Sequence, residues 1–132
     1  MDIISFREYC LSLPLVEETT PFDDVNLVYK VEGKMFALVS LDRPTLFFVK
    51  CDPDRAISLR DRYSQVEPAF HFNKRHWNQI HFEGELSERE LEAEIRHSYM
   101  LVAKLNVVPK LRREALLELI DSVGIKDDAE LF

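Results

Sequence analysis

The spacing of hydrophobic residues predicts two helices in the first half of the chain. Apolar residues recur at helical intervals over residues 3–13, and Ser5 with Glu8 matches a capping box. A second helix is expected from Asp52, an N-cap residue that Pro53 follows at the first helical position, to about Tyr63. Both predictions rest on local signals at the helix starts.

Two further helices are expected in the second half. Ser87 and Glu90 form a capping box, and an apolar stripe then continues for about 19 residues, to Leu105. Pro109 opens a last amphipathic helix, which Gly124 can end in the left-handed conformation that glycine favours.

Between the helices, residues typical of strands predict an antiparallel sheet. Residues 25–31, 34–41 and 45–50 are rich in strand formers and are separated by short turns, which is typical of a three-stranded meander. Residues 77–82 form a further expected strand, closed by Gly84.

The order α-β-β-β-α-β(β)-α-α predicts an α+β fold in which helices pack on an antiparallel sheet. With 132 residues the chain is long enough for one domain with its own core. We therefore expect a single domain over residues 1–132, with a core of about residues 2–120 and an acidic tail at residues 121–132.

Composition excludes several classes of protein. Three glycines cannot provide a phosphate-binding loop of the Walker type or a dinucleotide-binding fingerprint. The N-terminus has no signal-peptide pattern and no apolar run is long enough to span a membrane, so we expect a cytoplasmic protein without a membrane partner. Cys10 and Cys51 stand alone and are expected to be free thiols.

The net charge of −7 is unevenly distributed along the chain. Residues 68–82 carry two basic residues and no acidic one, and residues 104–113 carry four basic residues and no acidic one. The remaining residues sum to −13. A uniform nucleic-acid coat is therefore excluded, while a small basic contact on an acidic body is allowed.

The first basic segment combines cations with aromatic and amide side chains. Lys74 and Arg75 could contact phosphates, and the amides of Asn73 and Asn78 could read base edges. Stacking could come from His71 or Phe72. A structural interpretation stays open, in which the asparagines satisfy turn backbone and Trp77 is a core residue. The candidate nucleic-acid contacts here are Asn73, Lys74, Arg75, His76 and Asn78.

The second basic segment places Lys110, Arg112 and Arg113 in the first turn of the last predicted helix. Cations oppose the helix dipole there, at a cost of about 0.3 to 1 kcal/mol each. Such an arrangement either marks a nucleic-acid contact or is neutralised by nearby carboxylates. We include Lys110, Arg112 and Arg113 as candidate supporting contacts.

Several motifs in the sequence resemble the MmcQ/YjbR family over about residues 2–120. They are Val31–Ala37, Lys50-Cys51-Asp52-Pro53, Pro68, the run Asn73-Lys74-Arg75-His76-Trp77-Asn78, and Ser98-Tyr99. The resemblance implies a frataxin-like fold with a double-wing arrangement, which is associated with DNA binding. Gln79 departs from the family pattern, which has threonine at that place, and residues 121–132 lie outside the pattern.

The leading hypothesis is a non-enzymatic domain that binds DNA through residues 73–78, without a cofactor and as a monomer. Two alternatives stay open: a protein-interaction module with an aromatic anchor at Phe72 and Trp77, and a small-ligand pocket formed by His76, Trp77 and Ser98. The spacing of the four histidines matches no metal site, and neither cysteine has a base nearby in the sequence.

Overall fold

The computed structural model describes residues 1–129, over which it has four helices and one six-stranded sheet. The helices are α1 (Ile3–Ser12), α2 (Pro53–Arg62), α3 (Glu88–Leu105) and α4 (Lys110–Val123). The strands are β1 (Val16–Thr19), β2 (Asn26–Val31), β3 (Lys34–Ser40), β4 (Leu46–Lys50), β5 (Val66–Pro68) and β6 (Trp77–His81). The predicted α+β class is confirmed.

The sheet is antiparallel throughout, with strand order β1-β2-β3-β4-β6-β5. The meander of β2, β3 and β4 and the strand β6 follow the sequence prediction. The short edge strand β1 is not part of the prediction, and β5 is the optional second strand that the predicted order allows after the second helix without giving its residues. β1 has four residues, two of them acidic, and β5 has three and ends in proline, so neither carries a clear alternation of its own.

The caps set the helix boundaries. Ser87 and Glu90 form the expected capping box of α3, Asp52 caps α2, and Gly124 ends α4 with φ +79°. The first helix differs from the prediction, because Asp2 is its N-cap. The Asp2 carboxylate accepts a hydrogen bond from the Ser5 backbone N–H at 2.9 Å, so Ser5 is the third helical residue of that box.

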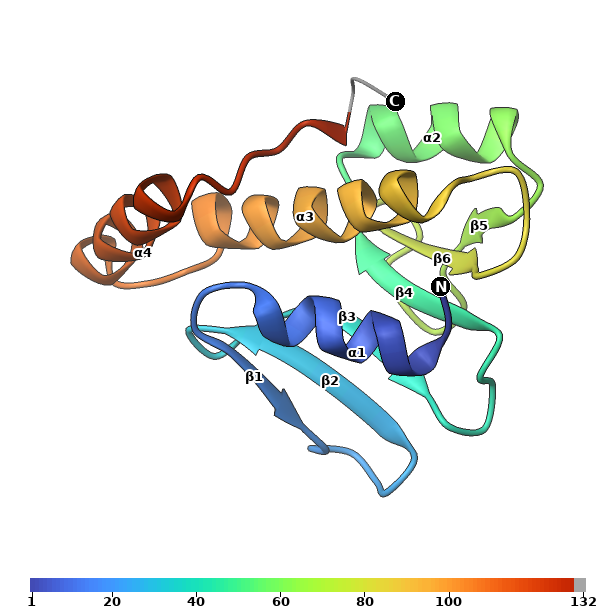
Figure 1. The fold of residues 1–132 in the computed structure, drawn as a ribbon, viewed down its shortest axis with the longest axis horizontal. Coiled ribbons are helices and arrows are strands. Elements are labelled where there is room, and N and C mark those ends of the chain that lie inside the picture. The colour runs from blue at the N-terminus through green and yellow to red at the C-terminus, as the bar shows by residue number, and fades with distance from the viewer. Residues whose placement is uncertain (130–132) are drawn as a thin grey trace.

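The main core lies between one face of the sheet and the helices α1 and α3 (Figure 1). The buried ring of Phe6 on α1 contacts Tyr29, Phe47 and Phe82 at centroid distances of 5.6, 4.8 and 6.0 Å. This aromatic group joins the first helix to strands β2 and β4 and to the residue that follows β6. Since α2 and α4 also contribute buried residues to this core, the helices of residues 1–129 all lie on the same side of the sheet.

The opposite face of the sheet, here called the outer face, has a second and smaller core. Its buried members are Val28, Leu38, Leu46, Phe48, Ala69 and Trp77, and Met35 and Phe72 pack against them. Ala69 and Phe72 belong to residues 69–76, which connect β5 to β6 and which we call the β5–β6 loop. This loop thus supplies a partial third layer over the sheet.

The segment after α4 returns along the helices (Figure 1). Arg96 of α3 binds the Asp128 carboxylate at 2.7 Å, and Arg55 of α2 donates to the Ala129 carbonyl at 2.9 Å. Ala129 is buried. Residues 125–129 of the expected acidic tail are therefore packed against the domain, and the rest of that tail, residues 130–132, lies outside the described residues.

Candidate functional site

The β5–β6 loop is closed by hydrogen bonds of its own backbone. Ala69 N–H donates to the Trp77 carbonyl at 3.1 Å, and Trp77 N–H donates to the Asn73 carbonyl at 2.9 Å. The Asn73 side-chain oxygen accepts from Arg75 N–H at 3.0 Å. Asn73 is exposed, but its backbone carbonyl and its side-chain oxygen both accept hydrogen bonds that hold the turn.

Arg60 of α2 anchors the loop through hydrogen bonds from its guanidinium group. Its Nε donates to the side-chain oxygen of Asn78 at 2.7 Å, and its guanidinium also donates to the carbonyl oxygens of Lys74 and Trp77. Asn78 is fully buried. The prediction that Asn78 reads base edges is therefore wrong, because its side chain faces the inside of the domain.

Trp77 and Phe72 attach the loop to the outer face of the sheet. The Phe72 ring lies 4.9 Å from the Trp77 ring and stacks on Phe48 at 5.1 Å. Trp77 is 9% exposed, so it is a core residue and not the partner anchor of the alternative hypothesis. Phe72 is half-buried, with most of its contact made inside the domain.

Gln79 fixes the start of the same loop. Its side-chain oxygen accepts from Phe70 N–H at 2.9 Å, while its Nε2 donates to Glu67 at 3.0 Å. The Glu67 carboxylate also contacts His81 at 2.6 Å, and these two hydrogen bonds lower the pKa of Glu67 below its ordinary value. Gln79 thus positions the start of the loop.

The cations of the loop point outward. Lys74 and Arg75 are exposed, and neither forms an ion pair with a carboxylate of residues 1–129. The Lys74 ammonium lies 5.8 Å from the centroid of the Phe70 ring, which is 55% exposed. His76 is half-buried, and its carbonyl accepts from Cys51 N–H at 2.7 Å. Two cations and one aromatic ring are therefore presented to solvent.

The basic residues of α4 do not extend this surface. Lys110 pairs with Glu114 at 3.8 Å, Arg112 pairs with Glu32 at 3.3 Å, and Arg113 donates to the Val107 carbonyl at 3.5 Å. Figure 1 places α4 at the left end of the long axis, whereas β5 and β6 lie to the right. The expected supporting contacts are thus separated from the loop, and two of them have carboxylate partners.

A groove lies on the outer face of the sheet beside the loop. Its volume is about 360 Å³, and it opens between Phe22, from the β1–β2 connection, and Phe70 of the β5–β6 loop. Its apolar lining is completed by Met35, Leu38, Phe48 and Phe72, and polar groups come from Asn26, Ser40, Arg43 and His71. We call this the outer-face groove.

The sequence did not indicate the outer-face groove, because three distant segments form it. One local signal was present: Phe22 is an aromatic residue within an acidic, turn-rich stretch, and in the structure it is 68% exposed. His71 has φ +69°, which is uncommon for a residue other than glycine. This backbone conformation occurs at the rim of the groove, between Phe70 and Phe72.

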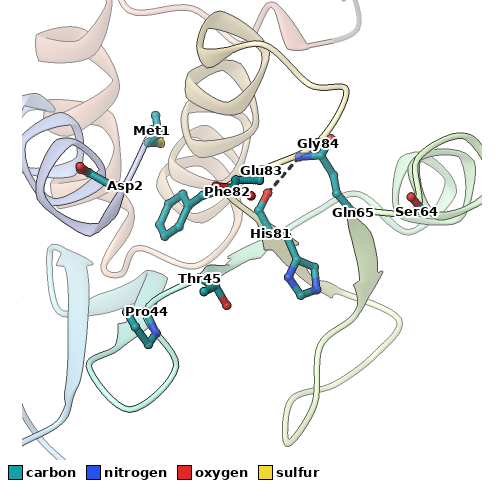
Figure 2. Close-up of a pocket in the computed structure, with 10 residues that line it drawn as sticks. All are labelled: Met1, Asp2, Pro44, Thr45, Ser64, Gln65, His81, Phe82, Glu83 and Gly84. Atoms are coloured by element: carbon teal, nitrogen blue, oxygen red, sulfur yellow. Dashed lines mark hydrogen bonds between the residues drawn. The ribbon is translucent and has the colours of Figure 1, made fainter.

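A second hollow lies at another edge of the domain, with a volume of about 560 Å³ (Figure 2). The side chain of Gln65 points toward Gly84, and its Nε2 donates to the His81 carbonyl at 2.9 Å. The Gln65 oxygen accepts from Leu86 N–H at 2.8 Å. These contacts join β5, β6 and the start of α3, so we assign them to architecture.

The small-ligand pocket proposed from His76, Trp77 and Ser98 is not assembled. Ser98 is buried on α3, where its hydroxyl donates to the Phe36 carbonyl at 2.5 Å and accepts from Lys50 N–H at 2.8 Å. Trp77 packs in the outer core instead. The neighbouring Tyr99 also serves the fold, since its hydroxyl donates to the Pro14 carbonyl at 2.8 Å.

Thiol and metal chemistry receive no support within residues 1–129. Cys10 and Cys51 are free and buried, and burial raises the pKa of each thiol above its usual value, which opposes a reactive thiolate. No group of three His, Cys, Asp or Glu side chains in this part of the chain is placed to hold a metal ion.

No helix within residues 1–129 is both long and apolar enough to cross a membrane.

The fold and the site together define an α+β domain. Its helices cover one face of the sheet, and the β5–β6 loop covers part of the other face. The YjbR family profile matches residues 11–101, and the chain belongs to this family. It is similar to YjbR of Escherichia coli (strain K12), with 31% identity over 121 residues that cover 90% of this chain and 100% of that protein.

Other relatives agree with this assignment. YbdF of Escherichia coli O157:H7 is 35% identical over 97 residues, covering 73% of this chain and 80% of that protein. A crystal structure of a DUF419-domain protein from Deinococcus radiodurans superposes with a TM-score of 0.79 and 33% identity, over 95% of this chain and 89% of that one. A Pseudomonas syringae protein shares the fold, with a TM-score of 0.65, 23% identity, and coverage of 76% and 98%.

Proposed function

We propose that this protein is a non-enzymatic binding domain that contacts DNA through the β5–β6 loop. Lys74 and Arg75 would bind phosphate oxygens, and Phe70 would contribute an aromatic surface. One observation carries the proposal: two adjacent exposed cations that pair with no carboxylate of residues 1–129 lie on an acid-free loop, while the whole chain has a net charge of −7. Cations without such partners can release counterions from a phosphate backbone.

The anchoring of the loop supports the proposal. Arg60 binds its backbone from α2, Gln79 holds Phe70, and Phe72 stacks on the sheet. A loop that is fixed before binding loses less conformational entropy when a ligand binds. The contact is small and directional, which agrees with a net charge of −7 on the whole chain.

The test is fluorescence anisotropy with labelled DNA across a series of salt concentrations. For wild type we expect the logarithm of affinity to fall linearly with the logarithm of salt concentration, with a slope of roughly −2 for two phosphate contacts. The variant Lys74→Glu with Arg75→Glu should bind at least ~10-fold more weakly and with a shallower slope.

The matched control is Lys34→Glu with Lys110→Glu, which changes the net charge equally at two exposed positions outside the loop. We expect it to bind nearly as well as wild type. Equal losses in both double variants would show that net charge alone matters, and would reject the loop as the contact. Absence of binding by wild type at low salt would reject DNA as the ligand.

A further inference from the structure

We propose that the outer-face groove holds an unpaired base of single-stranded DNA, while the phosphate beside that base contacts the cations of the β5–β6 loop. The inference rests on the proposed function and names the form of DNA that the site takes. It starts from the position of the groove, which adjoins the loop through Phe70 and Phe72.

The walls of the groove provide aromatic surface from two sides. The β1–β2 connection and the β5–β6 loop belong to opposite edges of the sheet, and each contributes an exposed phenylalanine, Phe22 at 68% and Phe70 at 55% exposure. Between them the floor is apolar, with Leu38 and Phe48 each 5% exposed. A flat ring that enters this space would lie against aromatic and aliphatic side chains, which is the environment that binds nucleobases.

Charges around the groove orient such a strand. Lys74 lies over Phe70 on the loop side, and Arg43 lines the groove. Neither forms an ion pair within residues 1–129, although the Arg43 charge also acts on the Glu67 carboxylate. On the other side, Asp23 and Asp24 follow Phe22 directly in the sequence. The phosphate backbone is therefore favoured at the loop and disfavoured at the β1–β2 connection, so the neutral base points inward, toward Phe22.

Asp23 also explains why Phe22 is held in position. Its carboxylate accepts from the backbone N–H groups of Val25 and Asn26 at 2.9 and 2.8 Å, and from the Asn26 side chain at 2.7 Å. These hydrogen bonds lower the pKa of Asp23 and fix the turn that carries Phe22. The groove is thus bounded by two anchored loops, with a volume of about 360 Å³ that falls within the range of ligand sites.

A paired base cannot use this site. In a duplex the bases stack on one another and expose only their edges in the grooves, so their faces are unavailable to Phe22 or Phe70. The geometry therefore favours a single strand, whose bases are free to leave the stack. Duplex DNA could still touch Lys74 and Arg75 through phosphates alone.

The experiment compares fluorescein-labelled dT12 with a dA·dT duplex of the same length, in anisotropy titrations of the full chain. Wild type should prefer the single strand by at least ~10-fold, because stacking adds to the phosphate contact. Phe22→Leu keeps an apolar side chain and leaves every loop cation in place. It should lose at least ~5-fold in affinity for dT12 and nothing for the duplex.

Two comparisons keep the result interpretable. Leu111→Ala removes an exposed apolar side chain from α4, 79% exposed, and should bind both probes as wild type does. Phe70→Leu should repeat the loss for dT12, and circular dichroism should show that each variant is folded. Equal wild-type affinity for both probes, or unchanged dT12 binding by Phe22→Leu, overturns the groove inference. The proposed function then still stands if binding depends on Lys74 and Arg75, whereas no binding of either probe overturns both.

Discussion

Arg60 of α2 and Asn78 of β6 are joined by a hydrogen bond of 2.7 Å between the guanidinium Nε and the amide oxygen. The same guanidinium holds two carbonyl oxygens of the segment that precedes Asn78. One side chain on a helix thus positions the loop that carries Lys74 and Arg75. The amide residues near these cations serve mainly to build the loop.

This role of Arg60 can be measured as stability. Arg60→Ala removes hydrogen bonds from a charged donor and leaves the buried Asn78 oxygen without a partner, so the free energy of unfolding should fall by about 2 to 4 kcal/mol. Arg62→Ala on the same helix is the control, since within residues 1–129 the polar contacts of Arg62 are with Tyr63 alone, over the ring and at the hydroxyl. Urea denaturation should show a loss below ~0.5 kcal/mol for the control. Equal losses in the two variants would contradict the anchoring role.

Ser98 is a second point where one side chain holds two segments. Its hydroxyl satisfies the Phe36 carbonyl and the Lys50 N–H, on neighbouring strands β3 and β4. Ser98→Ala leaves both groups unpaired inside the core and should cost about 2 to 4 kcal/mol of unfolding free energy. Ser122→Ala, at an exposed position of α4, should cost under ~0.5 kcal/mol. A Ser98→Ala protein as stable as wild type would show that the two backbone groups find other partners.

Gly84 is expected to accept a side chain only at a cost in stability. A Cβ atom there would lie 2.3 Å from the Gln65 side-chain oxygen, and the backbone has φ +153°. Gly84→Ala must therefore displace the amide that binds His81 and Leu86, at a cost of about 2 to 3 kcal/mol. Gly33→Ala is the comparison, because it has φ +78° with open space around it and should cost only about 1 kcal/mol of backbone strain. Thermal unfolding that ranks the two variants in the opposite order would refute the steric argument.

The returning C-terminal segment should make stability depend on acid pH. Burial alone would raise the pKa of Asp127, but the hydrogen bond from His97 Nδ1 at 2.9 Å and the attraction between the two groups lower the pKa below its ordinary value. A depressed carboxyl pKa contributes stability above its unfolded value, and this contribution is lost as pH falls through the folded pKa.

Asp127→Asn replaces the ionisable carboxyl group with a neutral amide. We expect the variant to lose about 1 kcal/mol near pH 7 and to approach wild type in stability below about pH 4. Asp121→Asn, exposed on α4, is the control and should follow the wild-type pH curve. Parallel curves for wild type and Asp127→Asn over this range would mean that the His97 contact does not favour the ionised carboxylate.

Local signals allowed much of the fold to be predicted from the sequence. The capping box at Ser87 and Glu90, the Asp52 cap and the Gly124 stop act within a few residues, so they are visible without tertiary structure. β1 was not predicted, and the residues of the optional strand β5 were not identified, because the pairing of both strands depends on partners outside the strand itself, Val16 with Val31 and Val66 with Ile80.

The candidate site was predictable in part for the same reason. Lys74 and Arg75 form one acid-free segment, which charge patterning reveals directly. That Asn78 faces inward follows from the strand register, in which it pairs with Val49 while Trp77 faces the opposite side. The groove requires Phe22, Leu38 and Phe70 to lie close together across the sheet. No local sequence pattern predicts that these residues come together.

The most direct test of the central claim is to follow backbone amide resonances of the ¹⁵N-labelled protein while single-stranded dT12 is added. We expect the largest shifts in residues 70–76 and around Phe22, and little change at Lys110, Arg112 and Arg113. Shifts that cluster on α4 instead, or the absence of any shift at low salt, would contradict the β5–β6 loop as the DNA contact.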